Sequence, residues 1–142
     1  MSRFWPRAAT ITLAITLLGC SSTTEPLGNH VDFARALWLG RRPSAYTFEV
    51  ATASSWLPRS GYYRVQVSNG QVVAARDSSG QAVADFGITV DGIWDDLLEH
   101  RARGELNSAR FDERGVPVEV DMGPWAVDGG VHYSVRNFAA SR

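Results

Sequence analysis

The chain has 142 residues, with 14 basic and 15 acidic side chains and a single cysteine. The charges are nearly balanced and spread along the chain, without the basic stripe of a nucleic-acid-binding surface, so we expect no nucleic-acid partner. About 123 residues remain once an N-terminal signal is removed, which is enough for one domain with a real core and too few for two.

An apolar segment near the N-terminus ends in the only cysteine. Arginines precede an uncharged run from Ala8 to Leu18, which is typical of a secretory signal and is too short to span a bilayer. The run closes with Leu17-Leu18-Gly19-Cys20, which resembles the lipobox of bacterial lipoproteins. That resemblance implies that residues 1–19 are a lipoprotein signal peptide and that Cys20 is the lipid attachment site and the first mature residue.

The lipobox predicts where the protein is located and limits its chemistry. We expect an exported protein that is lipid-anchored to the bacterial membrane, on the periplasmic side of the outer membrane if the cell is Gram-negative, since Ser21 follows the cysteine. With its one thiol used by the anchor, the domain is expected to have no disulfide, no thiolate nucleophile and no Cys-based metal site. Residues 20–29 are rich in Ser, Thr, Pro and Gly and read as a flexible tether before a single domain over 30–139.

The first predicted element is a short helix between Asn29, as N-cap, and Gly40, as its stop. Apolar residues at helical spacing give this helix one apolar face: Val31, Ala34, Leu37 and Trp38. After Pro43 the pattern changes to period two, which predicts half-buried strands around Tyr46, Phe48 and Val50 and around Tyr63, Val65 and Val67.

A tight hairpin is predicted where the second and third strands meet. Asn69-Gly70 lies between Val67 and Val72, and a type I′ turn needs positive φ at both central residues, which Asn and Gly tolerate. These two strands are therefore expected to pair.

A second helix is predicted from about Val90 to Arg103. Thr89 is its expected N-cap and Gly104 its stop. Its apolar stripe contains Ile93, Trp94, Leu97 and Leu98, and its acidic residues lie toward the N-terminal half, as the helix dipole prefers.

Three more strands are expected after this helix. The first contains Ala109 and Phe111 and leads through a turn over residues 112–115 into an alternating strand from Val116 to Met122; the last runs from Val131 to Phe138. Pro117 removes a ladder donor, so its strand is expected to be at an edge or bulged near its start.

Together these elements predict an α+β domain in the order α-β-β-β-α-β-β-β. The simplest architecture is an antiparallel sheet of five to six strands with two helices on one face. The other face is expected to carry polar residues, namely Glu49, Arg64, Gln66, Glu119, Asp121, His132 and Arg136.

With these elements placed, residues 32–139 resemble an uncharacterised family of bacterial lipoprotein domains of unknown function. The resemblance rests on the order of six motifs: a short helix ending at Trp38, Tyr46-Thr47-Phe48, the Asn69-Gly70 hairpin, Thr89-Val90-Asp91, Phe111-Asp112-Glu113-Arg114-Gly115-Val116-Pro117 and the closing strand to Phe138. These motifs are structural rather than chemical, and the resemblance implies no catalytic residue. A Cys-x-Cys that the family often has near the first strand is replaced here by Ala51-Thr52-Ala53, so no thiol role is carried over.

Catalytic and metal-binding patterns are weak in this sequence. It has no Gly-x-Ser-x-Gly elbow and no His-Glu-x-x-His, and its three histidines are far apart, so we expect no metal and no cofactor. Asp91, Asp95 and Glu99 lie along the second predicted helix, where carboxylates four residues apart share a face and can act as acid and base. The alternative is a solvated helix whose first turns complement the dipole, and we favour it.

Two tryptophans beside prolines are the candidate binding residues. Trp56 precedes Leu57-Pro58 and Trp125 follows Gly123-Pro124, in expected loops where an exposed ring is costly without a partner. The alternative is that both rings fold back over the ends of the core.

The function we predict is a membrane-anchored lipoprotein whose domain is a non-enzymatic binding or interaction module in the cell envelope, with an unknown envelope protein or small ligand as its partner. Two alternatives stay open at this point. One is a carrier of a small ligand or peptide with an apolar cavity between sheet and helices, and the other is an envelope enzyme using the carboxylates of the second helix with His132.

Overall fold

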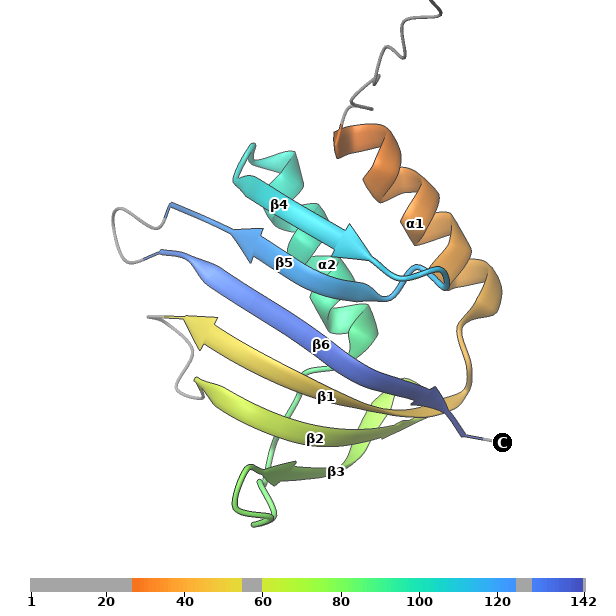
Figure 1. Cartoon of the computed structure of the whole chain (residues 1–142), viewed down its shortest axis with the longest axis vertical. Helices are drawn as coiled ribbons and strands as arrows, with labels where there is room; N and C mark the ends of the chain where they lie inside the picture. Colours follow the sequence, from red (N-terminus) through yellow and green to blue (C-terminus); the bar gives the residue numbers. More distant parts are fainter. Residues whose placement is uncertain (1–26, 55–59, 125–128, 142) are drawn as a thin grey trace, which may run out of the picture.

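The computed structural model describes residues 27–54, 60–124 and 129–141. The predicted element order is confirmed, and Figure 1 labels the elements along the chain. They are α1 (Leu27–Arg41), β1 (Ala45–Ser54), β2 (Gly61–Ser68), β3 (Gln71–Asp77), α2 (Val90–Ala102), β4 (Leu106–Phe111), β5 (Pro117–Met122) and β6 (Val131–Ala140).

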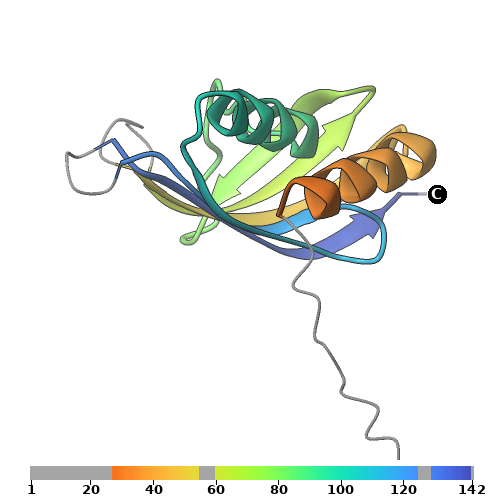
Figure 2. The same ribbon diagram turned by 90° about the horizontal axis from the view of Figure 1, so that it is seen from above.

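The strands form one six-stranded sheet in the order β3-β2-β1-β6-β5-β4. Every neighbouring pair is antiparallel, and both helices lie on the same side of the sheet (Figure 2). The fold class is therefore α+β, as predicted. The first and last strands, β1 and β6, pair at the centre of the sheet, so each half of the chain adds its other two strands outward from that pair.

The core lies between the helices and the sheet. Alternate residues of β1 and β2 face it, and Tyr46, Phe48 and Val65 are each 1% exposed or less. The helices supply Trp38 and Trp94, which are also almost fully buried. Burial of such large side chains stabilises the fold by roughly 1.5 to 3 kcal/mol each. With no disulfide available to the described residues, apolar packing between the two layers carries the domain's stability.

The second helix is built as its sequence predicted. The Thr89 Oγ1 accepts a 3.0 Å hydrogen bond from the backbone N–H of Gly92, which is an N-cap. At the other end Gly104 has φ of 74°, and the N–H groups of Gly104 and Glu105 donate to the carbonyls of Arg101 and His100. These two bonds form a Schellman motif, which satisfies the last carbonyls of the helix.

The hairpin is also confirmed. Asn69 has φ of 51° and Gly70 has φ of 76°, as a type I′ turn between β2 and β3 requires. The backbone N–H of Asn69 donates to the carbonyl of Ser44, which ties this turn to the start of β1.

The structure corrects two local predictions. Helix α1 begins at Leu27 and ends at Arg41, so Asn29 lies inside the helix rather than at its N-cap, and Gly40 does not end it. Strand β5 lies between β6 and β4, so Pro117 is not on an edge strand. The bulge that was the alternative is present, because the register between β4 and β5 shifts at Phe111, the partner of Pro117.

Candidate functional site

A groove of about 580 Å³ lies where the end of α1, the start of α2 and the β2–β3 turn meet. Its size falls within the range of small-ligand sites, which is about 300 to 1,000 Å³. It is lined mainly by polar residues: Arg42, Pro43, Ser44, Tyr46, Asn69, Gly70 and Asp91. We call it the Arg42–Asp91 groove.

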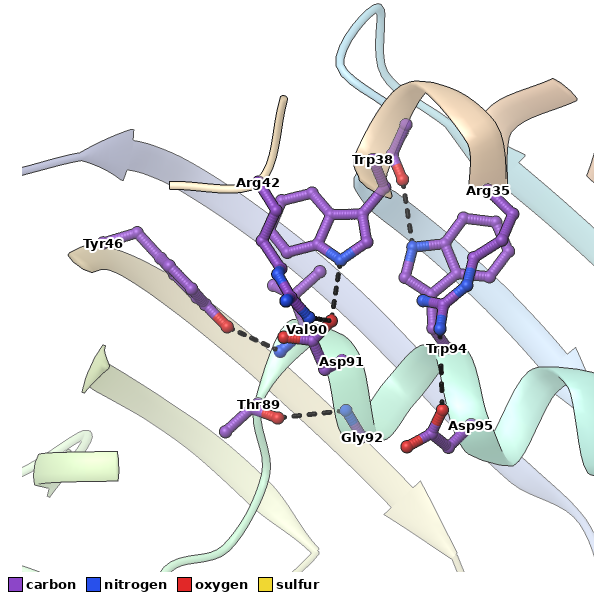
Figure 3. A network of polar contacts seen from close by, with 11 residues as sticks. Arg35, Trp38, Arg42, Tyr46, Thr89, Val90, Asp91, Gly92, Trp94 and Asp95 are labelled. Carbon is purple, nitrogen blue, oxygen red and sulfur yellow. Dashed lines mark hydrogen bonds and ion pairs between the residues drawn. The ribbon is translucent and has the colours of Figure 1, made fainter. Parts of the chain in front are cut away.

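Asp91 is the central acceptor of this groove. Its Oδ1 accepts a 2.9 Å hydrogen bond from the indole Nε1 of Trp38 and a 3.0 Å bond from Nη1 of Arg42 (Figure 3). The Arg42 side chain is 49% exposed and the Asp91 side chain 20% exposed. A guanidinium therefore stands at the groove surface beside a partly covered carboxylate, and the same carboxylate joins the two helices.

Tyr46 forms the inner end of the groove. Its hydroxyl accepts a 3.3 Å hydrogen bond from the backbone N–H of Val90, the first residue of α2 (Figure 3). Burial raises the pKa of Tyr46 to about 12, with the Asp91 carboxylate adding to the rise. The phenol is therefore neutral at physiological pH and acts as a fixed hydrogen-bonding group rather than as a base.

Close contact at Gly115 holds α1 in place behind the groove. A Cβ at Gly115 would lie 2.1 Å from the carbonyl oxygen of Ala34 and 2.7 Å from the backbone nitrogen of Trp38. The carbonyl of Gly115 also accepts a 3.1 Å bond from Nε1 of Trp94. The turn before β5 thus touches both helices, and this contact requires glycine because φ is also positive there, at 79°.

The carboxylates of α2 do not converge with His132. Asp95 lies 3.7 Å from Arg35 of α1, and Glu99 accepts a 2.8 Å bond from Arg103. His132 is on β6, where its Nδ1 lies 2.8 Å from Asp121 of β5. Asp121 and His132 are directly paired in the sheet, and their neighbours Val120 and Tyr133 are buried toward the helices, so His132 faces away from α2.

A second polar cluster lies on the sheet face that is opposite the helices. The sequence placed Glu49 and Arg64 on this face but did not indicate their contacts with Tyr62 and Asn137. Glu49 is only 9% exposed, although its strand pattern places it on the outer face. Its carboxylate accepts hydrogen bonds from Tyr62, from Nδ2 of Asn137 at 2.6 Å and from Nη2 of Arg64 at 2.9 Å. The Tyr62 hydroxyl and then the Arg64 guanidinium are the largest causes that hold the pKa of Glu49 below its usual value.

A β-bulge explains how Asn137 reaches Glu49. Arg136 pairs with Glu49, while Ala139 pairs with Thr47, so β6 has one extra residue opposite Phe48. Asn137 takes the positive φ, 51°, that this irregularity needs. The cluster is thus built by strand register, for which a single sequence has no local signal.

The sequence-predicted binding and attachment residues lie outside the described part of the chain. Cys20, Trp56 and Trp125 are all in this group, so their predictions stay predictions. Among the residues that the structure describes, no three His, Cys, Asp or Glu side chains are grouped as a metal site needs. Within the same ranges, no helix is both long enough and apolar enough to cross a membrane.

The Arg42–Asp91 groove is suited to polar recognition. It presents a cation and an anion joined by a 3.0 Å hydrogen bond and an exposed turn at Asn69 and Gly70, with the almost fully buried Tyr46 behind them. Such a surface can bind a peptide or another ligand that carries both charge signs, through charge-assisted hydrogen bonds. Four of its residues come from motifs noted in the sequence: Tyr46, Asn69, Gly70 and Asp91.

The structure thus defines an α+β domain with a polar groove at one end of its helical layer. The chain belongs to a family of unknown function, DUF6174, whose model matches residues 30–140. Comparisons with curated proteins and with solved structures gave no match. The family match supports the predicted resemblance to an uncharacterised domain family.

Proposed function

We propose that this protein is a lipid-anchored lipoprotein of the bacterial cell envelope whose domain is a non-enzymatic binding module. The observation that supports a lipid anchor is the Leu17-Leu18-Gly19-Cys20 box after a short uncharged apolar run. The only cysteine of the chain stands at the one position where such a box needs it.

The Arg42–Asp91 groove is the surface that we assign to binding. Its volume suits a peptide segment or small polar ligand, and its charged groups are held by bonds to both helices rather than left to rearrange. Preorganised polar groups reduce the entropy that a ligand must lose on binding. We therefore expect the partner to be a polar ligand in the cell envelope. A loop of an envelope protein is the ligand that we consider first.

The engagement of the α2 carboxylates supports a binding role over catalysis. Asp91 bonds Trp38 and Arg42, and Asp96 accepts a 2.7 Å bond from the hydroxyl of Tyr133. An acid and base pair for catalysis needs two titratable groups that converge on one substrate position. Among the described residues, Asp91 connects α2 to α1 and Asp96 connects α2 to the sheet instead.

A small-ligand or peptide carrier is the second candidate, and the groove volume is the observation that favours it. The ligand in that case is polar and enters the Arg42–Asp91 groove. The apolar cavity expected between sheet and helices is not the place for it, because large side chains fill that layer, with Trp38, Trp94, Ile93 and Leu97 almost fully buried.

The anchor is tested by replacing its acceptor. Cells that express the wild-type chain, Cys20→Ser and a Ser21→Ala control are labelled with an alkyne analogue of palmitate and separated into membrane and soluble fractions. We expect lipid label and membrane recovery for the wild type and the control, and neither for Cys20→Ser. A Cys20→Ser chain that still carried the lipid label would show that the lipobox assignment is wrong.

The groove is tested by site-specific cross-linking in intact envelopes. A photoreactive residue at Ser44, which is exposed in the groove, is compared with one at Ser79, which is exposed in the turn after β3. We expect a distinct cross-linked species from position 44 only, and we expect Arg42→Glu to remove it. The same products from both positions, or products that survive Arg42→Glu, would rule out the groove as the binding surface.

A further inference from the structure

Helix α1 is apolar on two sides. One side faces the core, where Val31, Ala34 and Trp38 are 3% exposed or less. The other side faces solvent, where Phe33 is 65% exposed and Leu39 is 55% exposed. Two large apolar side chains therefore stand in solvent on the outer side of α1, where a helix of a globular protein usually carries polar residues.

The exposed apolar residues lie together on one side of the helix, on an arc that also contains Asp32. Successive helical residues turn by about 100°, which places them on a single arc opposite the core side. The members are Phe33, Ala36, Leu37, Leu39 and Gly40, of which Leu37 is half-buried and the other four are exposed. We call this the α1 outer strip.

Two charged residues of α1 have partners on α2: Asp32, which lies within the arc of the strip, and Arg35, which lies at its edge. Arg41, the last residue of α1, donates to the carbonyl oxygen of Glu113 instead. Asp32 accepts bonds of 2.6 and 3.1 Å from the guanidinium of Arg101. Arg35 lies over the ring of Trp94 at 5.3 Å and 3.7 Å from Asp95 (Figure 3). The Asp32 side chain is 67% exposed but paired with Arg101, so the strip brings no unpaired carboxylate into the headgroup region of a membrane.

The strip begins close to the predicted lipid. Leu27, the first residue of α1, is the seventh residue after Cys20. Seven residues span at most about 25 Å even when fully extended, and Phe33 lies about 9 Å further along the helix. In Figure 2 the chain enters the domain through α1, which lies at one side of the helical layer. A lipid on Cys20 therefore keeps the strip within reach of the bilayer surface at all times.

We propose that the α1 outer strip lies in the headgroup region of the membrane that holds the Cys20 lipid, so that the domain docks on the bilayer with a fixed orientation. This inference rests on the proposed anchor, because tethering supplies the high effective concentration that lets a strip of this small size bind. Aromatic and aliphatic side chains on one face of a surface helix are what interfacial helices insert among lipid headgroups.

The orientation has a consequence for the groove. Arg42 follows directly after α1, so the groove lies at the end of the helix that is farther from the anchor. With α1 lying along the membrane, the groove would be held close to the membrane surface rather than out in the solution. The partner is then approached from the plane of the membrane.

The test uses the full-length lipidated protein in vesicles of phosphatidylethanolamine with a minor share of phosphatidylglycerol. Nitroxide labels are attached to Phe33→Cys, Leu39→Cys and Val73→Cys, and their collisions with a water-soluble nickel chelate are compared with their collisions with lipid-soluble oxygen. Val73 is the matched control, because it is 57% exposed, much like Leu39, but lies on the edge strand β3. Circular dichroism checks that each labelled chain is folded.

We expect several-fold lower nickel accessibility at positions 33 and 39 when vesicles are present, with no change at position 73. Equal accessibility of all three positions on the vesicle-bound protein would overturn the proposal. Shielding of positions 33 and 39 in whole envelope membranes but not in these vesicles would also overturn it, and would assign the strip to a protein partner.

The same samples separate this inference from the anchor itself. In a lipidated wild-type chain the Cys20 thiol is blocked, so the nitroxide reagent adds nothing to it, and mass spectrometry shows the lipid. A wild-type chain that takes up the label has a free Cys20, and the proposed anchor is then wrong. Because docking rests on the anchor, that result would overturn the docking proposal as well, whereas equal accessibility on a chain shown to be lipidated would overturn the docking alone.

Discussion

The indole Nε1 of Trp38 donates a 2.9 Å hydrogen bond to Oδ1 of Asp91, across 53 positions of sequence. The bond joins α1 to the first turn of α2 and borders the groove. Trp38 is 1% exposed, so its N–H has no access to bulk water as an alternative partner. A single carboxylate thereby fixes the helical layer and one wall of the candidate site.

Replacing Asp91 by alanine is expected to destabilise the protein by about 1 to 3 kcal/mol, because the buried indole N–H of Trp38 loses its acceptor. Urea denaturation followed by circular dichroism measures the free energy of unfolding. Asp95→Ala is the control, since the Asp95 side chain is 74% exposed and its ion pair with Arg35 is long, at 3.7 Å. The control is expected to change stability by less than about 0.5 kcal/mol, and an equal loss in both variants would refute the assignment.

Gly115→Ala is expected to destabilise the protein by at least about 3 kcal/mol, since the new Cβ would lie 2.1 Å from the carbonyl oxygen of Ala34 and α1 would have to move. Gly80 makes a matched control, with φ of 84° and nothing within 4 Å of a new Cβ. Gly80→Ala is expected to cost only the backbone strain, about 1 to 2 kcal/mol. Thermal denaturation of both variants gives the comparison, and similar losses would mean that the contact with α1 is unimportant.

The cluster around Glu49 predicts a stability contribution that depends on pH. The folded-state pKa of Glu49 is lowered from its ordinary value of 4.5, first by the Tyr62 hydroxyl and then by Arg64 and Asn137. A lowered folded pKa means that the stabilisation is present above pH 4.5 and is lost as pH falls through the lower folded value. The difference in stability between the wild type and Glu49→Gln should therefore shrink below that pH.

Tyr62→Phe provides the control for this cluster. It removes the bond that contributes most to the shift, so the pKa of Glu49 is expected to return toward 4.5. NMR titration of the Glu49 side chain in both proteins measures the change directly. An unchanged pKa in Tyr62→Phe would mean that this bond does not hold the carboxylate in its charged form.

Tyr46 is expected to ionise only in strong alkali, because burial raises its pKa from 10.0 to about 12. A raised folded pKa means that the stabilisation by the neutral phenol is complete below pH 10 and is lost as pH rises toward 12. NMR titration of ring-labelled tyrosine, assigned with Tyr46→Phe, gives the midpoint. A midpoint near 10 would show that the phenol is open to water and does not form the inner end of the groove as described.

Local features were the most predictable from sequence. Thr89 and Gly104 delimit α2, and Asn69-Gly70 gives the β2–β3 hairpin, because each signal acts within a few residues of itself. With Asn29 as N-cap the helix was predicted to start at His30, three residues after its observed start at Leu27, because Asn is a favoured capping residue. Pro117 was predicted to lie on an edge strand or at a bulge, and the structure has the bulge; the sequence could not choose between them, since the position of a strand in the sheet depends on the whole chain.

The candidate site was not predictable in the same way. The sequence explained each groove residue by its local structure alone: Tyr46 as an aromatic of a strand, Asn69 as a turn residue and Asp91 as an acid in the first turn of a helix. Only the fold brings the three together. The contacts of Glu49 were not predictable either, because Asn137 reaches its carboxylate only through a bulge in β6. Trp56 and Trp125, the candidate binding residues named from the sequence, lie outside the described ranges and stay predictions.

The pairing of β1 with β6 determines when the domain can complete its folding. Residues 45–54 pair with residues 131–140, so the central strand pair of the sheet cannot form until residues 131–140 are available. Until then β1 has a neighbour only in β2, and the apolar residues Tyr133 and Val135 are missing from the core. If the chain is exported from its N-terminus, as proposed, the sheet is completed only after residues 131–140 have crossed, so we expect the domain to fold on the far side in a single late step.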